Sequence, residues 1–335
     1  MPQFLKLNVS GRASDALSRV FTLALLLTVG LGFVFRQQLL DEYRLYGYTA
    51  PAAIEQLATQ DGMKPDTRSV FYVNHPVLQN KETFKTVCPN GGGEKTIILG
   101  CYHGGQNGIF LLQVSDDRLN GVTQVTAAHE MLHASYDRLS SKDRQDVDSM
   151  LLAYYNNGLQ DQRIKDTIEG YKQSEPKDVV NEMHSIFGTE ITTLPPTLEA
   201  YYSRYFTDRS KVLAFAGQYQ TEFSSRQAAI KQDDIQLAEL KTRITGLESS
   251  LGGQQKEIVA REQDLQSRRS SGDTASYNSG VGPYNTSIET YNSQVRLVQS
   301  LVEQYNQLVA TRNEIASQIS ELSNALSTNT TQISQ

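Results

Sequence analysis

His129-Glu130-Met131-Leu132-His133 is the stretch from which the fold of the surrounding chain is best predicted. Two histidines four residues apart share one face of an α-helix, where both imidazoles can bind one metal ion, with Glu130 beside them. No helix-breaking residue lies between Thr126 and Arg138, so we predict a helix over that range. The pattern is typical of a Zn²⁺ site for metal-assisted hydrolysis. In the alternative interpretation, both histidines are ordinary hydrogen-bonded residues of the core or surface.

A third metal ligand is expected from another segment, because catalytic zinc sites take three protein ligands and leave the fourth position for water. The best candidate is Glu182, in a predicted helix with Pro176 near its start and Gly188 near its end. The apolar residues of this helix recur at helical spacing: Val179, Val180, Met183, Ile186 and Phe187. They bury one side and leave Glu182 free to face a neighbouring helix. A solvent-exposed or capping carboxylate is the alternative.

Two other side chains compete for the third position. Glu190 is expected beyond the helix end, and His184 lies two residues from Glu182, on another face. His184 is instead a candidate donor to the oxyanion of a tetrahedral intermediate, as is one of three tyrosines: Tyr201, Tyr202 and Tyr205. Packing and surface hydrogen bonding are the alternative roles of these four residues.

These segments resemble the gluzincin metallopeptidases, whose zinc is held by the two histidines of His-Glu-x-x-His and by a glutamate on a later helix. Thermolysin-like members carry there an Asn-Glu pair followed by Ser-Asp-Ile-Phe-Gly-Thr. In this chain Asn181-Glu182 precedes His184-Ser185-Ile186-Phe187-Gly188-Thr189, which is one residue shorter and lacks the Asp that would orient a zinc-bound histidine. The resemblance covers about residues 108–205.

The resemblance implies an α+β fold, with a zincin-like domain in which a small sheet precedes the zinc-binding helices. It implies that His129, His133 and Glu182 bind zinc. It also implies that Glu130 does not touch the metal and is the base that takes a proton from the attacking water. The expected activity is that of a zinc-dependent metalloendopeptidase.

The sheet is expected upstream of the zinc helix, where four runs rich in β-branched and aromatic residues are separated by glycine-rich turns. These runs are residues 69–73, 83–88, 96–102 and 108–114. The resemblance implies that an edge strand pairs with an extended peptide substrate, and residues 108–114 are the candidate. Residues 103–108 form either a plain turn or the rim of the cleft.

The two cysteines, Cys88 and Cys101, lie on neighbouring predicted strands at a spacing compatible with a disulfide across a hairpin. Such a bond requires an oxidising compartment. Two buried free thiols are the alternative.

The compartment is inferred from Val20–Phe35, an uncharged apolar run bounded by Arg19 and Arg36. We predict a single-pass membrane anchor at residues 20–36, because apolar neighbours and snorkelling arginines extend a run that is slightly shorter than the usual ~20 residues. The excess of basic residues before it places residues 1–19 in the cytoplasm and the remainder outside. A cleaved signal peptide and a buried core helix are the alternatives.

The predicted catalytic domain spans residues 41–215, and residues 216–335 are expected to form an antiparallel coiled-coil hairpin with its tip at 268–276. The first arm has a heptad seam of Ile230, Leu237, Leu240, Ile244, Leu247, Leu251, Ile258 and Leu265. The second has a seam of Val295, Val298, Val302, Val309, Ile319 and Leu326, and Tyr-Asn pairs that begin at residues 277, 284, 291 and 305. The asparagines either fix the register or are solvated surface residues.

The net charge of −6, without a basic cluster or any tryptophan, gives no support to nucleic-acid binding. No phosphate loop or serine or cysteine nucleophile motif is present in the sequence. We therefore expect a membrane-anchored zinc metallopeptidase that acts on a peptide or protein outside the cytoplasm. The alternative is an envelope scaffold or docking protein, in which the hairpin binds a partner or itself and the zincin-like domain is inactive.

Overall fold

A computed structural model describes residues 11–88 and 99–327. The chain falls into two compact units. Among these residues, the first unit contains the chain up to Gln113 together with Gly121–Ala216. The second contains Val114–Asn120, with the short 3₁₀ helix Asp117–Leu119, and Gly217–Ser327. The fold is mostly helical, with one small sheet in the first unit and two long helices towards the C-terminus.

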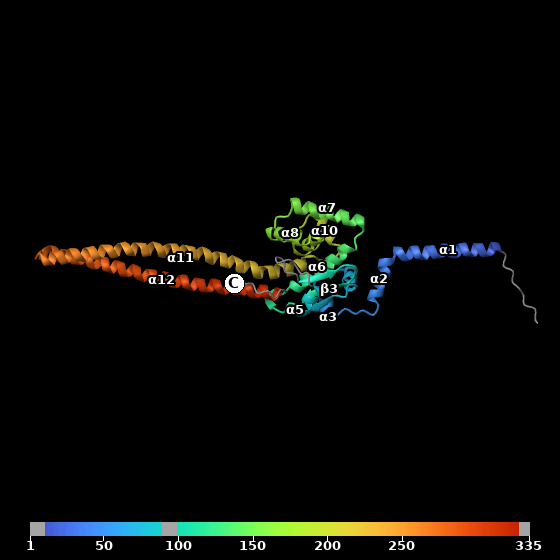
Figure 1. Cartoon of the computed structure of the whole chain (residues 1–335), viewed down its shortest axis with the longest axis horizontal. Coiled ribbons are helices and arrows are strands. Elements are labelled where there is room, and N and C mark those ends of the chain that lie inside the picture. Colours follow the sequence, from blue (N-terminus) through green and yellow to red (C-terminus); the bar gives the residue numbers. More distant parts are fainter. Residues whose placement is uncertain (1–10, 89–98, 328–335) are drawn as a thin grey trace, which may run out of the picture. The chain divides into compact units, whose positions relative to one another are not determined.

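The sheet has three strands, β1 (Val77–Gln79), β2 (Gly100–His103) and β3 (Gly108–Leu112), in the order β1-β3-β2. Strand β3 is labelled in Figure 1. Strand β1 runs parallel to β3, and β2 is antiparallel to it. Strand β3 was predicted, within residues 108–114, but it is the central strand and not the edge strand. Its two sides are already hydrogen-bonded, so the substrate-binding edge assigned to it is wrong; β2 and β1 are the edges.

Two of the four predicted strands are helices. Residues 69–72 belong to α4 (Pro65–Tyr72), and residues 83–87 belong to α5 (Lys81–Val87). Helix α4 begins with a proline at its first turn, and the side chain of Asn80 caps α5 by accepting a hydrogen bond from the backbone N–H of Thr83. These start signals outweigh the β-branched and aromatic composition. Of the run 96–102, residues 96–98 lie outside the described residues and residues 100–102 belong to β2.

Helix α6 (Val122–Asp137) is the centre of the first unit and carries the motif. Most of its residues are buried, because α3 (Ala52–Gln60), α4, α9, β2 and β3 all pack around it. It begins four residues earlier than predicted, after Gly121, whose φ of 99° is readily adopted only by glycine. A Cβ at Gly121 would lie 2.7 Å from the backbone oxygen of Phe215, so glycine also permits close packing there.

Four helices follow α6 in the first unit: α7 (Ser141–Asn157), α8 (Gln162–Ser174), α9 (Val179–Glu190) and α10 (Pro196–Tyr202). Helix α9 is the predicted third-ligand helix. It continues past Gly188 to Glu190, so the expectation that Glu190 lies beyond the helix is wrong. Gly188 allows close packing, because a Cβ there would lie 2.5 Å from Leu132 of α6.

The N-terminal segment is helical, as α1 (Gly11–Val34) and α2 (Arg36–Leu45). Among the described residues, no single helix is both long and apolar enough to cross a membrane. Only Ser18–Gly32 and Arg36–Leu45 together reach that length and apolarity, and a bend of 65° separates them. Eight large apolar side chains of the predicted anchor are more than half exposed: Val20, Phe21, Leu23, Leu25, Leu26, Leu27, Val29 and Val34.

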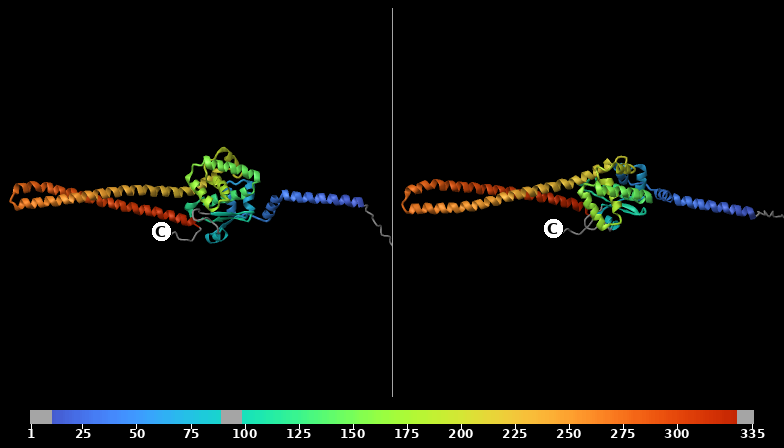
Figure 2. Two further views of the ribbon diagram at one scale, coloured as in Figure 1. Left: turned by 45° about the horizontal axis from the view of Figure 1, so that its top comes forward. Right: turned by 90° about the horizontal axis from the view of Figure 1, so that it is seen from above.

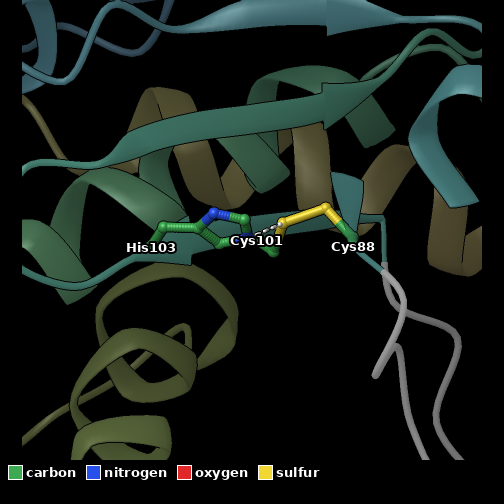
Figure 3. The surroundings of a disulfide bond; sticks show 3 residues. All are labelled: Cys88, Cys101 and His103. Carbon is green, nitrogen blue, oxygen red and sulfur yellow. Dashed lines mark hydrogen bonds between the residues drawn. A yellow bond between two sulfur atoms is a disulfide. The ribbon is translucent and has the colours of Figure 1, made fainter. Parts of the chain in front are cut away.

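Cys88 and Cys101 form a disulfide, as Figure 3 shows. Their Cα atoms are 6.2 Å apart, within the range that disulfides require. The expected location across a hairpin is wrong, however, because Cys88 caps the end of α5 and only Cys101 lies on a strand, β2. The bond therefore ties a helix end to the edge of the sheet. The ring of His103 lies beside it, with Nε2 3.5 Å from Cys101 Sγ.

Replacing both cysteines by serine is expected to lower the free energy of unfolding by about 3 kcal/mol, since the bond joins residues separated by 13 positions and so restricts the unfolded chain. Urea denaturation of the double variant measures the loss. The oxidised wild type and the wild type unfolded in the presence of a reductant are the controls, and the reduced wild type should behave like the variant. An unfolding midpoint that is the same in all three would contradict a stabilising role.

The second unit is dominated by a helical hairpin of α11 (Ser210–Ser270), from Gly217 onward, and α12 (Thr274–Leu326). The two helices lie side by side in both views of Figure 2. The two helices are antiparallel, because residues later in α11 contact residues earlier in α12. The pairs are Arg226–Gln318 at 3.1 Å, Asp234–Arg312 at 3.1 Å, Gln254–Gln294 at 2.9 Å and the contact of Leu265 with Gly280. The turn at residues 271–273 falls inside the predicted tip.

The seam of α11 is confirmed, since all eight predicted residues are at least half-buried. In α12 one assignment is wrong: Val302 is exposed and Leu301 takes its place in the core. The tyrosines at 277, 284, 291 and 305 are half-buried in the seam, whereas the asparagines that follow them are exposed. The asparagines are therefore surface residues, and the tyrosines supply the heptad repeat.

Candidate metal centre

Three side chains of the first unit converge as the sequence predicted. Nε2 of His129 lies 3.0 Å from Nε2 of His133. The carboxylate of Glu182 lies 3.5 Å from the first of these nitrogens and 3.3 Å from the second. All three donor atoms lie within 4.8 Å of one another and form a group able to hold a metal ion.

Helices α6 and α9 create this convergence. The two histidines lie one helical turn apart on the face of α6 that α9 covers, and Glu182 lies in the first turns of α9. The close contact of Gly188 with Leu132 brings the two helix backbones together. Glu182 and His133 are buried, and His129 keeps 17 % of its side chain exposed. The centre is therefore open to solvent mainly on the side of His129.

The separations match a tetrahedral Zn²⁺ site. Ligands at about 2.0–2.1 Å from a tetrahedral ion lie about 3.3 Å from one another, close to the three separations in this cluster. Oε2 of Glu182 is buried and finds no hydrogen-bond partner among the residues that the structure describes, although it lies 3.5 Å from Nε2 of His129. A buried carboxylate oxygen without a partner is costly, and a cation at the centre of the group would satisfy it. Two imidazoles and one carboxylate are also a usual donor set for catalytic zinc.

The electrostatics of the group favour a positive charge between the ligands. Burial lowers the pKa of His133, but the carboxylates of Glu182 and Glu130 outweigh it and raise that pKa to about 9. Burial raises the pKa of Glu182, but the charges of His133 and His129 outweigh it and hold that pKa well below its ordinary value. A metal ion would replace the proton as the positive partner of Glu182, with release of the proton.

The carboxylate of Glu130 lies beside the start of β2. A Cβ on Gly100 would lie 2.6 Å from Glu130 Oε1, so the glycine makes room for this carboxylate. The pKa of Glu130 is raised, first by burial and then by Glu182, although the two histidines and the backbone amide of Tyr102 act in the opposite direction. A raised pKa suits a group that must take up a proton near neutral pH. Glu130 thus lies between the ligand group and the edge strand.

Asn181, which directly precedes Glu182, lies beside His133. Its side chain helps to raise the pKa of His133. Its Oδ1 atom is buried without a well-aligned hydrogen bond, so the two groups are close but poorly oriented. Ring orientation by a neighbouring acceptor is a common feature of metal-bound histidines, and Asn181 is placed to supply it.

His184 and the three tyrosines form a buried cluster. Nε2 of His184 is 2.9 Å from the hydroxyl of Tyr201, which is 2.9 Å from that of Tyr205, and Tyr202 donates a hydrogen bond to the backbone oxygen of His184. Burial, with a smaller effect of the charges of His133 and His129, lowers the pKa of His184 to about 3. The His184 ring is fully buried, so this arrangement favours packing over contact with a substrate. Tyr205 is the most exposed of the four.

Two residues of the centre were missed by the sequence analysis. Tyr171, in α8, has its pKa raised by burial and then by Glu182 and Glu130. Glu175, just after α8, has its pKa raised by burial and then by Glu182 and Asp178. Both are half-exposed, and the charge of Glu182 acts on both, because α8 packs on α9. Nothing in the sequence marks them, since a tyrosine and a glutamate in an amphipathic helix are common.

Comparison of the chain with protein-family models, with curated proteins and with solved structures gives no match. The assignment of a function therefore depends on the geometry of the centre.

Proposed function

We propose that the chain is a zinc metallopeptidase of the gluzincin type, anchored in a membrane, with its catalytic domain outside the cytoplasm. The observation that carries the proposal is the meeting of His129, His133 and Glu182 at separations of 3.0–3.5 Å, with Glu130 beside them. Two imidazoles, one carboxylate and an adjacent carboxylate are the parts that zinc-assisted hydrolysis requires.

In this proposal the two histidines and Glu182 hold the ion, which when bound lowers the pKa of a water to about 7 and polarises a carbonyl group. Glu130 would accept a proton from the attacking water as the water oxygen bonds to the carbonyl carbon of the peptide. Glu130 then gives the proton to the amide nitrogen, so that the C–N bond breaks and the amine leaves neutral. The burial that raises the pKa of Glu130 supports both transfers.

The edge strand β2 is the proposed site of peptide binding, in place of β3. It is the edge strand that packs against α6, and Gly100 at its start contacts Glu130. An extended peptide added to this edge would pass beside Glu130. Tyr171 and Glu175, whose pKa values are raised by the charge of Glu182, are the proposed contacts for substrate side chains.

Membrane attachment is proposed for α1, because its large apolar side chains between Val20 and Val29 are exposed. A row of exposed apolar residues of this size is costly in water and favourable in lipid. The basic residues before it favour a cytoplasmic N-terminus. The disulfide of Cys88 and Cys101 supports an oxidising compartment for the catalytic domain.

The test is peptide-library cleavage by the full chain in detergent, with and without a zinc chelator. We expect about one zinc ion per chain by metal analysis, cleavage of peptide bonds, loss of cleavage with the chelator and recovery when Zn²⁺ is added back. A purified protein without bound zinc, unable to take it up, would refute the proposal. Zinc binding without cleavage of any peptide would favour the scaffold function instead.

A further inference from the structure

Helix α2, which directly follows the proposed anchor, is fixed to the first unit by one face. Both Oδ atoms of Asp41 accept hydrogen bonds at 2.8 Å from the guanidinium of Arg138, the residue that ends α6. Nε2 of Gln106, in the turn between β2 and β3, donates to Asp41 at 2.7 Å. A paired and half-buried carboxylate thus holds α2 against the end of the zinc helix.

The C-terminal end of α2 is held as well. Nε of Arg44 donates to the backbone oxygen of Val73 at 2.6 Å, and Nε2 of His75 lies 2.9 Å from the backbone oxygen of Arg44. The ring of Tyr48 stacks on that of His75, with centroids 4.5 Å apart. Helix α2 is therefore attached at two points along its length, and its orientation on the unit is fixed.

The opposite face of α2 is apolar and aromatic. Phe35, Leu39, Tyr43 and Tyr46 recur at helical spacing on the side away from Asp41 and Arg44. Their exposed fractions are 45 %, 58 %, 79 % and 90 %. A helix that covers a soluble domain normally places polar residues on its outer face. The outer face of α2 is instead apolar and aromatic, so it is suited to contact with a lipid or protein surface.

A lipid surface fits this face best. Phe35 alone separates α2 from α1, whose exposed apolar residues are the proposed anchor. Tyrosines beside a membrane span are typical of the headgroup region, where the ring is buried and the hydroxyl stays wet. The 65° bend between the two helices turns α2 towards the membrane plane if α1 crosses it. Arg36 and Glu42 border the face with opposite charges, which suits a zwitterionic surface.

We infer that α2 is an interfacial helix, which lays Phe35, Leu39, Tyr43 and Tyr46 into the headgroup region of the bilayer and so holds the catalytic unit directly against the membrane surface. The inference depends on the proposed anchoring by α1. It implies that peptide bonds close to the membrane are the substrates within reach of the centre, because α2 is joined to the end of α6 through Asp41 and Arg138.

The absence of tryptophan from the chain permits a direct test. Tyr43→Trp and Leu39→Trp each introduce a single reporter on the exposed face of α2, and Leu152→Trp introduces one on exposed α7 as the matched control. The full chain is reconstituted in phosphatidylcholine vesicles, either plain or with bromine atoms near the headgroup end of the acyl chains. We expect the α2 reporters to emit at shorter wavelength and to be quenched about twofold by the brominated lipid, since interfacial helices are buried roughly 5–10 Å into this region. The Leu152→Trp emission should not change.

The outcomes separate this inference from the proposed function. Vesicle-bound protein whose α2 reporters emit as in water would refute the interfacial helix while leaving the anchor and the peptidase intact. Reporters shifted to shorter wavelength without quenching by brominated lipid would show that a protein surface, such as a second copy, covers the face, and would also refute it. Failure of the chain to float with vesicles would refute the anchor itself.

Discussion

Replacing Glu130 by glutamine is expected to lower kcat for peptide cleavage by about 10²–10⁴-fold, the usual contribution of a general acid–base group. Glutamine has nearly the same shape as glutamate, so it keeps the packing against Gly100 and β2. It cannot take up the proton of the attacking water. Because Glu130 lies next to the ligand group but outside it, the number of zinc ions bound per chain should remain about one.

The measurement is kcat on a peptide found by library cleavage, together with zinc content and thermal stability of the variant. Glu55→Gln, which removes an exposed carboxylate on α3 of the same unit, is the matched control and should cleave like the wild type. Full activity of Glu130→Gln would show that another group moves the proton. Loss of zinc together with activity would place Glu130 among the ligands and would contradict the geometry.

The parts of the fold that the sequence predicts well depend on long, regular patterns. Helices α6 and α9 each have clear apolar spacing, and the hairpin repeats its seam over many heptads. The convergence of Glu182 with the two histidines was predicted from a resemblance and a helical face, and the distances agree with it. A long pattern averages out single exceptions such as Val302.

Short elements were predicted poorly because their amino-acid composition favours strands, whereas the residues that precede them favour helix starts. Residues 69–73 and 83–88 are rich in β-formers, yet Pro65 and Asn80 start helices before them. The three-residue strand β1 has too few residues to show an alternating pattern. Capping residues were therefore the more reliable signal at this length.

The surroundings of the centre depend on packing between distant segments, which no local pattern encodes. The position of β2 beside Glu130 follows from the strand order, and the approach of Tyr171 and Glu175 follows from the packing of α8 on α9. The attachment of α2 to the end of α6 joins residues 97 positions apart. Gly100 is the one local hint. A glycine at the start of a strand often marks a place where another group packs closely, and here that group is the side chain of Glu130.

Removing the charge of Glu182 is expected to weaken zinc binding more than any other single change on α9. Glu182→Gln should lower the affinity for Zn²⁺ beyond the roughly 10–100-fold loss that is typical when only an outer partner of a ligand is changed. The cause is the loss of the anionic donor that lies 3.3 Å from His133 and 3.5 Å from His129, in a buried site where a neutral amide compensates the ion poorly. Competition of the purified chain with a chromophoric chelator measures the affinity, and cleavage at saturating Zn²⁺ shows how much activity depends on ligand charge.

Glu175→Gln is the sharpest control, because the pKa of the Glu175 carboxylate is raised by the charge of Glu182, although Glu175 lies outside the group whose donors meet. If Glu182 is the third ligand, Glu175→Gln keeps zinc affinity within a few-fold and changes mainly KM, since Glu175 is a proposed contact of the substrate. If the two variants exchange their effects, the third ligand is supplied from the end of α8, and α9 serves to bury the histidines. Glu182→Asp separates charge from reach: it keeps the carboxylate but shortens the side chain by one methylene. An affinity between those of the wild type and Glu182→Gln would show that zinc binding requires both the charge and the position of the Glu182 carboxylate. That position is fixed by the close packing of α6 and α9 at Gly188.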